Sequence, residues 1–291
     1  IFVLLLIPAA LPAADFDLLV KGARVVDGTG NPWFQADVGV LNGKIAAVGP
    51  LGEHTATKVV EAEGLVLAPG FIDVHTHVED EVENFPGATN YLRDGVTTIV
   101  TGNCGGSQTD LAAFFSRLEK LGLGPNLASL IGHNSVRRKV MGSENRFAEA
   151  HEIAQMQKLV DAAMLDGAVG LSTGLIYVPG TYAATEEVIA LAETVSGHDG
   201  VYATHMRSEG LDVVEAVAEA IRIGTEAGVR VEISHFKIAS PRMWGRADEI
   251  IAMVEAARAE GVDVVVDQYP YEWSSTGLST TVPSWARAGG Q

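Results

Sequence analysis

Short apolar runs alternate with stretches of helical spacing through most of the chain. Seven apolar runs recur at intervals of roughly 30 residues, the size of a strand–helix unit; they span residues 71–74, 96–101, 127–131, 169–172, 201–204, 229–234 and 262–267. Between them, apolar residues recur at helical spacing in residues 111–121, 153–165, 188–195, 213–227 and 250–259. Near-continuously apolar strands that alternate with helices predict an α/β fold with a parallel sheet covered on both faces. We therefore expect residues 69–291 to supply strands one to seven of a TIM (β/α)8 barrel, with strand eight beyond residue 291.

Residues 15–68 show a different pattern, with short strands, glycine-rich turns and no helical period. The expected strands are residues 18–26, 38–41, 44–48 and 58–67, and the Asn42-Gly43 pair is a hairpin signal. We expect a small β-sandwich module here, which the C-terminal end of the protein would complete.

Residues 1–14 are uncharged and end in small residues. This run is too short to span a membrane as a helix, but it fits the remnant of a secretory signal. No cysteine follows it directly, which argues against a lipid anchor. It predicts export to the periplasm or the medium, with no membrane attachment once the signal is removed.

The charge balance is strongly acidic, with 37 acidic residues, 20 basic ones and a net charge of −17. Nucleic acids and anionic membrane surfaces attract clustered lysine and arginine, so this composition argues against both as partners. An acidic surface favours solubility and indicates neither a substrate nor an oligomeric state.

Two histidines, His75 and His77, follow the first apolar run directly. Positions i and i+2 of a strand point to the same face, so both imidazoles would project into one space. Imidazole is a common zinc ligand, and two converging imidazoles make half of a metal site. The pair alone fits equally well two surface histidines at the end of a strand.

The only cysteine of the chain, Cys104, follows the second apolar run. An exported protein normally pairs its cysteines, and this one has no partner within the chain. It is therefore either a thiolate that binds a metal or a buried, inert side chain.

The ends of the expected strands decide between these readings. The carboxyl ends of barrel strands meet at one rim, where barrel enzymes carry their chemistry. Five of the eight histidines and the cysteine occupy such ends, namely His75, His77, His133, His205, His235 and Cys104. Nitrogen and sulfur donors gathered at one rim predict a zinc site. We assign no role to His54, His151 and His198.

In these motifs the chain resembles the amidohydrolase superfamily and, within it, the N-acyl-D-amino-acid deacylases (D-aminoacylases). The likeness runs from about Asp15 to Gln291, and residues 26–30, 69–77, 102–105, 174–183, 204–207, 234–237 and 267–271 carry it. The His-x-His pair is typical of the superfamily. The Gly-Asn-Cys-Gly sequence at residues 102–105 and the Tyr-Val-Pro-Gly sequence at 177–180 are more specific to the D-aminoacylases.

The resemblance implies a set of metal ligands. Cys104, His205 and His235 would hold one tightly bound Zn²⁺, and His75 and His77 would shape a second, weaker metal position. Many members of the superfamily bridge two metals with a carboxylated lysine at strand four, where this chain reads Gly-Leu-Ser-Thr-Gly at residues 170–174. The thiolate of Cys104 would take that place. The general base of the family is an aspartate of strand eight, which we expect beyond residue 291, so no catalytic residue is assigned.

The resemblance also implies the reaction, which is zinc-dependent hydrolysis of N-acyl-D-amino acids to a carboxylate and a free D-amino acid. The α-carboxylate of such a substrate needs a cationic or hydrogen-bonding partner. Lys237 is the candidate, with Tyr177 and Tyr269 near it by resemblance, although either tyrosine would equally fit a residue that packs the rim. His133 would support a ligand or be a satisfied rim histidine, and Arg207 is expected to be structural.

Two other readings of function remain open. One is a different amidohydrolase reaction, such as the opening of a cyclic amide, the cleavage of an isoaspartyl dipeptide or the hydrolysis of an enamide. Those branches usually show the strand-four lysine, which this chain lacks. The other is a zinc-binding or solute-binding protein of the cell envelope without catalytic activity.

Overall fold

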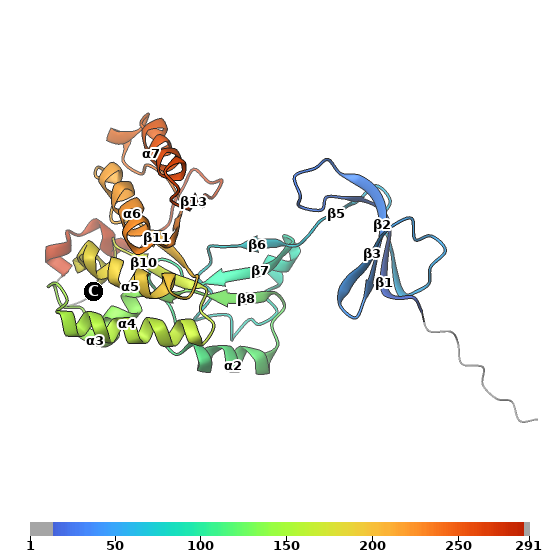
Figure 1. Ribbon diagram of the computed structural model, residues 1–291, viewed down its shortest axis with the longest axis horizontal. Helices are drawn as coiled ribbons and strands as arrows, with labels where there is room; N and C mark the ends of the chain where they lie inside the picture. The colour runs from blue at the N-terminus through green and yellow to red at the C-terminus, as the bar shows by residue number, and fades with distance from the viewer. Residues whose placement is uncertain (1–13, 288–291) are drawn as a thin grey trace, which may run out of the picture. The chain divides into compact units, whose positions relative to one another are not determined.

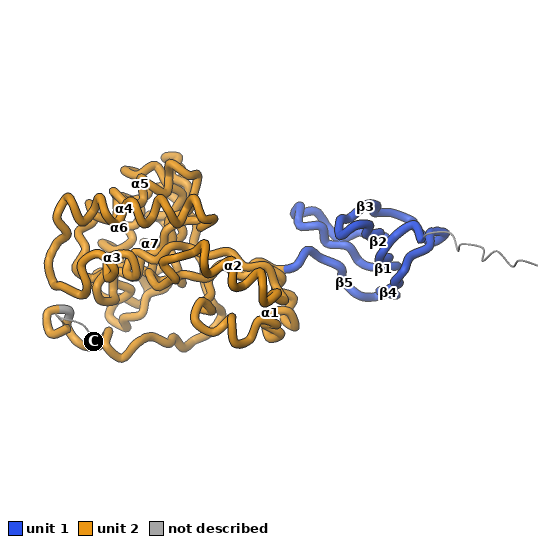
Figure 2. The backbone as a smooth tube through the Cα atoms, turned by 90° about the horizontal axis from the view of Figure 1, so that it is seen from below, with its two compact units in different colours: residues 1–70 blue, residues 71–291 orange. Residues whose placement is uncertain are grey.

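The computed structural model describes residues 14–287 and divides the chain into two units, one ending at Gly70 and one beginning at Phe71 (Figure 2). The sequence placed this boundary at Ala68. Residues 1–13, which make up nearly all of the expected export signal, lie outside the described residues. Among the described helices, none is long and apolar enough to cross a membrane.

The first unit is a five-stranded mixed sheet. Its strands are β1 (Phe16–Val25), β2 (Phe34–Leu41), β3 (Lys44–Gly49), β4 (Ala56–Glu61) and β5 (Val66–Leu67). The order is β3-β2-β1-β4, with β5 also paired to β1. The predicted strand at residues 58–67 is in fact two strands, because the chain turns between β4 and β5 at Gly64, where φ is +80°. Residues 14–70 contain one sheet, so the predicted sandwich stays a prediction.

The second unit contains the predicted parallel strands. They are β6 (Phe71–Asp73), β7 (Val96–Thr101), β8 (Asn126–Ser129), β9 (Ile131–Gly132), β10 (Gly170–Gly174), β11 (Val201–His205), β12 (Arg230–Ile233) and β13 (Val264–Val266). They form two parallel sheets, β6-β7-β8 and β13-β12-β11-β10-β9 (Figure 1). Only Leu130 separates β8 from β9, so these two strands share the third predicted position and join the sheets.

The helices follow the predicted spacing, which confirms the α/β class. They are α2 (Leu111–Leu121), α4 (Ala150–Leu165), α5 (Thr185–Ser196), α6 (Val213–Ala227) and α7 (Ala247–Ala259). Two more helices were not predicted, α1 (Thr89–Arg93) and α3 (His133–Met141). Helix α3 was missed because His133, Asn134 and Arg137 are among the residues that it buries, which hides its inner face from any hydrophobic pattern. Short 3-10 turns span η1 (Gly180–Tyr182), η2 (Pro241–Met243), η3 (Leu278–Thr281) and η4 (Ser284–Arg287).

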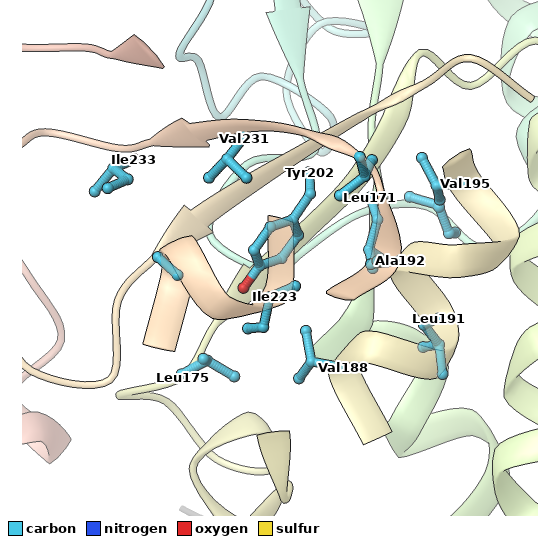
Figure 3. Packing of buried hydrophobic residues seen from close by; sticks show 14 of the residues in the cluster. Leu171, Leu175, Val188, Leu191, Ala192, Val195, Tyr202, Ile223, Val231 and Ile233 are labelled. Atoms are coloured by element: carbon cyan, nitrogen blue, oxygen red, sulfur yellow. The ribbon is translucent and has the colours of Figure 1, made fainter. Parts of the chain in front are cut away.

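A row of buried side chains sets the register of the central strands. Leu171, Tyr202 and Val231 are direct partners on β10, β11 and β12, and each is at most 1% exposed. Figure 3 shows Tyr202 at the centre of the cluster that α5 and α6 complete. Its hydroxyl lies 3.0 Å from Oγ1 of Thr173, so the buried oxygen is satisfied. Because side chains alternate along a strand, Tyr202 packs toward the helices while His205 points to the opposite face.

The turn after β7 passes close to β10. Gly105 has φ +80°, and a Cβ added there would lie 2.1 Å from Oδ1 of Asn134 and 2.7 Å from the nitrogen of Gly174. A Cβ added at the next residue, Gly106, would make only ordinary contacts, the nearest at 3.9 Å from the carbonyl oxygen of Asn103. Only a residue without a side chain therefore allows this turn to approach β10.

We expect Gly105→Ala to lower the free energy of unfolding by about 2–4 kcal/mol, because it adds backbone strain and a steric clash. Denaturant unfolding measures the change. Gly106→Ala is the matched control and should change stability little. Equal stability of the two variants would contradict the close approach of this turn to β10.

Candidate metal centre

The thiol of Cys104 lies among three imidazoles. Its Sγ is 3.5 Å from Nε2 of His75, 3.7 Å from Nδ1 of His205 and 3.7 Å from Nε2 of His235. These residues come from the ends of β6, β7, β11 and β12, so the parallel strands bring the four donors together. The set joins three residues expected at the tight site with His75, which was expected at the weaker one.

The distances from the thiol sulfur to the three imidazoles fit zinc. Among the described residues, the donor atoms of His75, Cys104 and His235 all lie within 4.8 Å of one another, whereas His205 falls in another group, with Glu209 and His235. Tetrahedral zinc has bonds of about 2.3 Å to sulfur and about 2.0–2.1 Å to nitrogen, which places the two donors roughly 3.5 Å apart. The sulfur–nitrogen distances of 3.5–3.7 Å match that edge length. A thiolate with three imidazoles is also a donor set that favours zinc over magnesium or calcium.

Two of the donor residues have a left-handed backbone. Cys104 has φ 53° and His235 has φ 41°, a region that costs non-glycine residues free energy. The side chain of Asn103 supports the backbone at Cys104, since its Nδ2 donates to Val74 O and Val100 O, both at 3.2 Å. Strain at two donors, held by surrounding hydrogen bonds, is typical of a preorganised site.

Carboxylates hold the outer nitrogens of two imidazoles. Nδ1 of His75 lies 2.6 Å from Oδ2 of Asp267, and Nδ1 of His235 lies 2.6 Å from Oε1 of Glu209. Such a partner leaves the opposite ring nitrogen free for a metal. The sequence assigned neither carboxylate: Asp267 was noted only as a strand end, and Glu209 belongs to the irregular segment after β11. For Asp267, its place at a strand end was a usable signal.

Burial shifts the pKa of two of the donors, His205 and Cys104. It lowers the pKa of His205 to about 3, so that imidazole is neutral and able to bind a metal at neutral pH. Burial, reinforced by Glu209 and Asp267, raises the pKa of the Cys104 thiol to about 12. A coordinated thiol is deprotonated outright, so zinc binding to this site would release a proton.

A cavity of about 120 Å³ opens onto the donors. Its lining includes three of the donors and all three residues predicted to bind substrate, Lys237, Tyr177 and Tyr269. The Nζ of Lys237 lies 2.6 Å from Oε1 of Glu209 and 5.4 Å from the centre of the Tyr269 ring. Lys237 therefore places an amino group at the cavity wall, where Glu209 is its carboxylate partner.

The two tyrosines that line the cavity differ in the contacts of their hydroxyl groups. The Tyr177 ring lies 4.8 Å from that of His205, centroid to centroid, and its hydroxyl is 3.4 Å from Nδ1 of His205. The hydroxyl of Tyr269 is buried and has no hydrogen-bond partner among residues 14–287. An unsatisfied hydroxyl in a cavity wall is suited to bind a polar ligand.

Two predicted histidines do not direct a ring nitrogen at the thiol of Cys104. His77 lines the cavity and packs against His75 with ring centroids 5.3 Å apart, but within the described part of the chain it joins no group of three converging donor atoms. His133 is fully buried, and its Nε2 lies 2.8 Å from Oε1 of Glu187, not against a donor. Arg207 pairs with Glu219 at 2.8 Å, the structural role expected for it.

Comparison with known proteins gives matches over most of the chain. The sequence model described as "Amidohydrolase family" matches residues 58–264. A D-aminoacylase from Alcaligenes xylosoxydans xylosoxydans is 41% identical over 286 residues, covering 90% of this chain and 59% of the relative. The chain thus spans less than two thirds of the length of this relative.

Solved structures agree with the sequence matches. A crystal structure of a D-aminoacylase superposes with a TM-score of 0.84 at 40% identity, covering 88% of this chain and 59% of the other. A structure of N-acyl-D-glutamate deacylase from Bordetella bronchiseptica superposes with a TM-score of 0.86 at 36% identity, with the same coverage. That protein is complexed with zinc and with a phosphonate inhibitor that mimics the tetrahedral intermediate of its reaction.

We expect Cys104→Ala to weaken zinc binding by more than about 100-fold, because it removes the donor that faces all three imidazoles. Elemental analysis after dialysis measures the zinc retained. His151→Ala, a change at an exposed histidine of α4, is the control and should keep the parent's zinc. Parental zinc content in Cys104→Ala would rule out this donor set.

The pKa of His205 predicts how the metal-free protein responds to pH. The folded state keeps His205 neutral down to about pH 3, whereas an unfolded histidine binds a proton below about pH 6.5. The free energy of unfolding should therefore fall as the pH is lowered from about 7 toward 3.

Replacing His205 with asparagine should reduce that slope by up to about 1.4 kcal/mol per pH unit between about pH 4 and 6. Denaturant unfolding at a series of pH values, in the presence of a chelator, provides the measurement. His151→Asn should keep the parental slope. An unchanged slope in His205→Asn would show that His205 titrates normally in the folded state.

Proposed function

This chain belongs to the amidohydrolase family, and on that premise we propose that the protein hydrolyses the amide bond of N-acyl-D-amino acids with the help of zinc. The observation that carries the proposal is the position of Cys104, whose thiol faces three imidazoles at the wall of a cavity that also contains Lys237. The likeness to D-aminoacylase and to N-acyl-D-glutamate deacylase supports the same reaction class.

The donor residues would hold the metal, and zinc in such a site supplies a Lewis acid that polarises a carbonyl and lowers the pKa of water. Cys104, His205 and His235 are the proposed ligands of one tight zinc, and His75 with His77 those of a second, weaker position. In this structure His75 is as close to the thiol as the other two imidazoles are. Asp267 and Glu209 would keep the His75 and His235 rings in their binding orientation.

The cavity wall would hold the rest of the substrate. Lys237 would bind the α-carboxylate, in exchange for or beside its contact with Glu209. The free hydroxyl of Tyr269 and the ring of Tyr177 would border the acyl group or the α-carbon. A carboxylate fixed at Lys237 and a carbonyl fixed at the donors leave one direction for the side chain, which is the basis for selecting one enantiomer.

The proposal extends to the whole protein. Proton transfer would fall to an aspartate of strand eight, expected beyond residue 291. That strand would complete a (β/α)8 barrel, and a second sheet would complete the β-sandwich of the first unit. The apolar run at residues 1–14 supports export to the periplasm or the medium. The substrate is the small molecule named above, with neither nucleic acid nor membrane as a partner.

We expect the full-length protein to release the amino acid from N-acetyl-D-amino acids far faster than from the L-enantiomers, by about 100-fold or more in kcat/KM. Amine release from paired D and L substrates is the assay, with dihydroorotate and an isoaspartyl dipeptide as controls. Similar rates on both enantiomers would remove the stereochemical proposal. Turnover of a control substrate alone would favour a cyclic amidase or a dipeptidase.

In the same assay, Lys237→Met should raise KM by about tenfold or more, because it removes a charge-assisted contact made in the ground and transition states. Its zinc content should match the parent's. Lys158→Met, at an exposed position of α4, is the matched control. A parental KM in Lys237→Met would exclude this lysine from substrate binding.

A further inference from the structure

The segment between β10 and α5 carries Tyr177 to the metal centre. It runs from Gly174, the last residue of β10, to Ala183 and includes the short turn η1. The side chain of Tyr177 reaches the donors, with the hydroxyl 3.4 Å from Nδ1 of His205 and 2.9 Å from Oγ1 of Thr276. The backbone nitrogen of Leu175 also donates to His205 O at 3.0 Å. We call residues 174–183 the tyrosine segment.

Side chains of α3 bind the backbone of this segment. The Nδ2 of Asn134 donates to Gly174 O at 3.0 Å and to Tyr177 O at 3.3 Å. Arg138 Nη2 donates to Val178 O at 3.0 Å, and Arg137 Nε donates to Pro179 O at 3.3 Å. One helix thus satisfies the carbonyls on both sides of the tyrosine.

Two other arginines bind further carbonyls of the tyrosine segment. Arg207, two residues after the donor His205, donates from Nη1 to Thr181 O at 3.3 Å and from Nη2 to Ala183 O at 3.1 Å. Arg287 donates to Ile176 O at 3.3 Å. Tyr177 O and Pro179 O also accept hydrogen bonds from the backbone nitrogens of Thr181 and Tyr182, at 2.8 and 3.1 Å. The position of the segment therefore depends on these side chains together with its own turns.

Arg137 is the buried centre of this arrangement. Its side chain is 0% exposed, and its Nη1 lies 3.6 Å from Oε2 of Glu187. Its Nη2 donates to Arg146 O at 2.6 Å. The other oxygen of Glu187 faces His133 at 2.8 Å. A buried guanidinium needs such partners because burial disfavours its charge, and its planar fork joins α3, α5 and the tyrosine segment.

We propose that Arg137 is a positioning residue for Tyr177, holding the tyrosine segment so that its ring and hydroxyl close the substrate cavity beside His205. The inference rests on the proposed deacylase function for its effect on catalysis, but not for the anchoring of the segment. Among residues 14–287, Arg137 is not part of the cavity lining, and its hydrogen bonds go to Pro179, Met141 and Arg146 rather than to a donor. Its effect on substrate therefore passes through Tyr177.

The first test compares Arg137→Lys with the parent in the full-length, zinc-loaded protein. Lysine keeps the charge but lacks the fork that reaches Pro179 O and Arg146 O together. We expect amide hydrogen exchange in residues 175–183 to accelerate by about tenfold or more, with exchange in α6 unchanged. Arg138→Gln, at an exposed position, should accelerate the same segment to a smaller degree even if Arg137→Lys folds poorly.

The second test is a double-mutant cycle with Tyr177→Ala, read in KM and kcat for an N-acetyl-D-amino acid. Alone, Arg137→Lys should raise KM about fivefold to tenfold with little change in kcat. In the Tyr177→Ala background the same change should alter KM by less than about twofold, because the residue through which it acts is gone. Arg222→Lys, an exposed arginine paired with Glu226, is the matched control and should alter neither constant.

The outcomes separate the two proposals. Additive effects in the cycle, or unchanged exchange of residues 175–183 in both arginine variants, would overturn the role of Arg137. No turnover of any N-acyl-D-amino acid by the parent would overturn the proposed function, and the exchange measurement would then decide the anchoring alone. Accelerated exchange together with a non-additive cycle would establish the positioning role.

Discussion

The geometry of the metal centre depends on two contacts made by the carboxylate of Asp267. It lies at the end of β13, binds Nδ1 of His75 beyond β6, and accepts a hydrogen bond from the backbone of His235. Strands β6 and β13 belong to different sheets, so no ladder of backbone hydrogen bonds joins them. Burial opposes the charge of Asp267, yet the bond from His75 holds its pKa below the ordinary value. One ionised carboxylate thus sets the distance between two of the donors.

Other contacts in the site hold two donor residues in backbone conformations that non-glycine residues rarely adopt. Cys104 and His235 have left-handed backbones, and Gly105 allows the cysteine turn to approach β10. Hydrogen bonds from Asn103 offset part of that strain. On the cavity wall, Oε1 of Glu209 lies 2.6 Å from both Nδ1 of His235 and Nζ of Lys237. Glu209 thus links the ring of a donor histidine to the lysine of the cavity wall.

The elements with apolar buried faces could be predicted from the sequence, whereas the buried polar contacts could not. The parallel strands and five of the helices were predictable because their buried faces are apolar, and apolar residues repeat with the period of the element. Helix α3 was not, because it buries the polar side chains of Asn134 and Arg137 against the tyrosine segment. The contact of His133 with Glu187 could not be predicted either, since it joins two buried residues that are distant in sequence.

The sequence by itself indicated that nitrogen and sulfur donors gather at one rim, because parallel strands end at one edge and Cys104, His205 and His235 each follow a strand. The choice of these three as ligands came from the family resemblance. The same resemblance indicated Lys237 and Tyr177. Only the tertiary structure decided that His75, rather than His77, stands beside the thiol, and that Glu209 and Asp267 orient the rings. These choices depend on backbone angles and on contacts between distant loops, where differences of an ångström decide which atoms can share a metal or a proton.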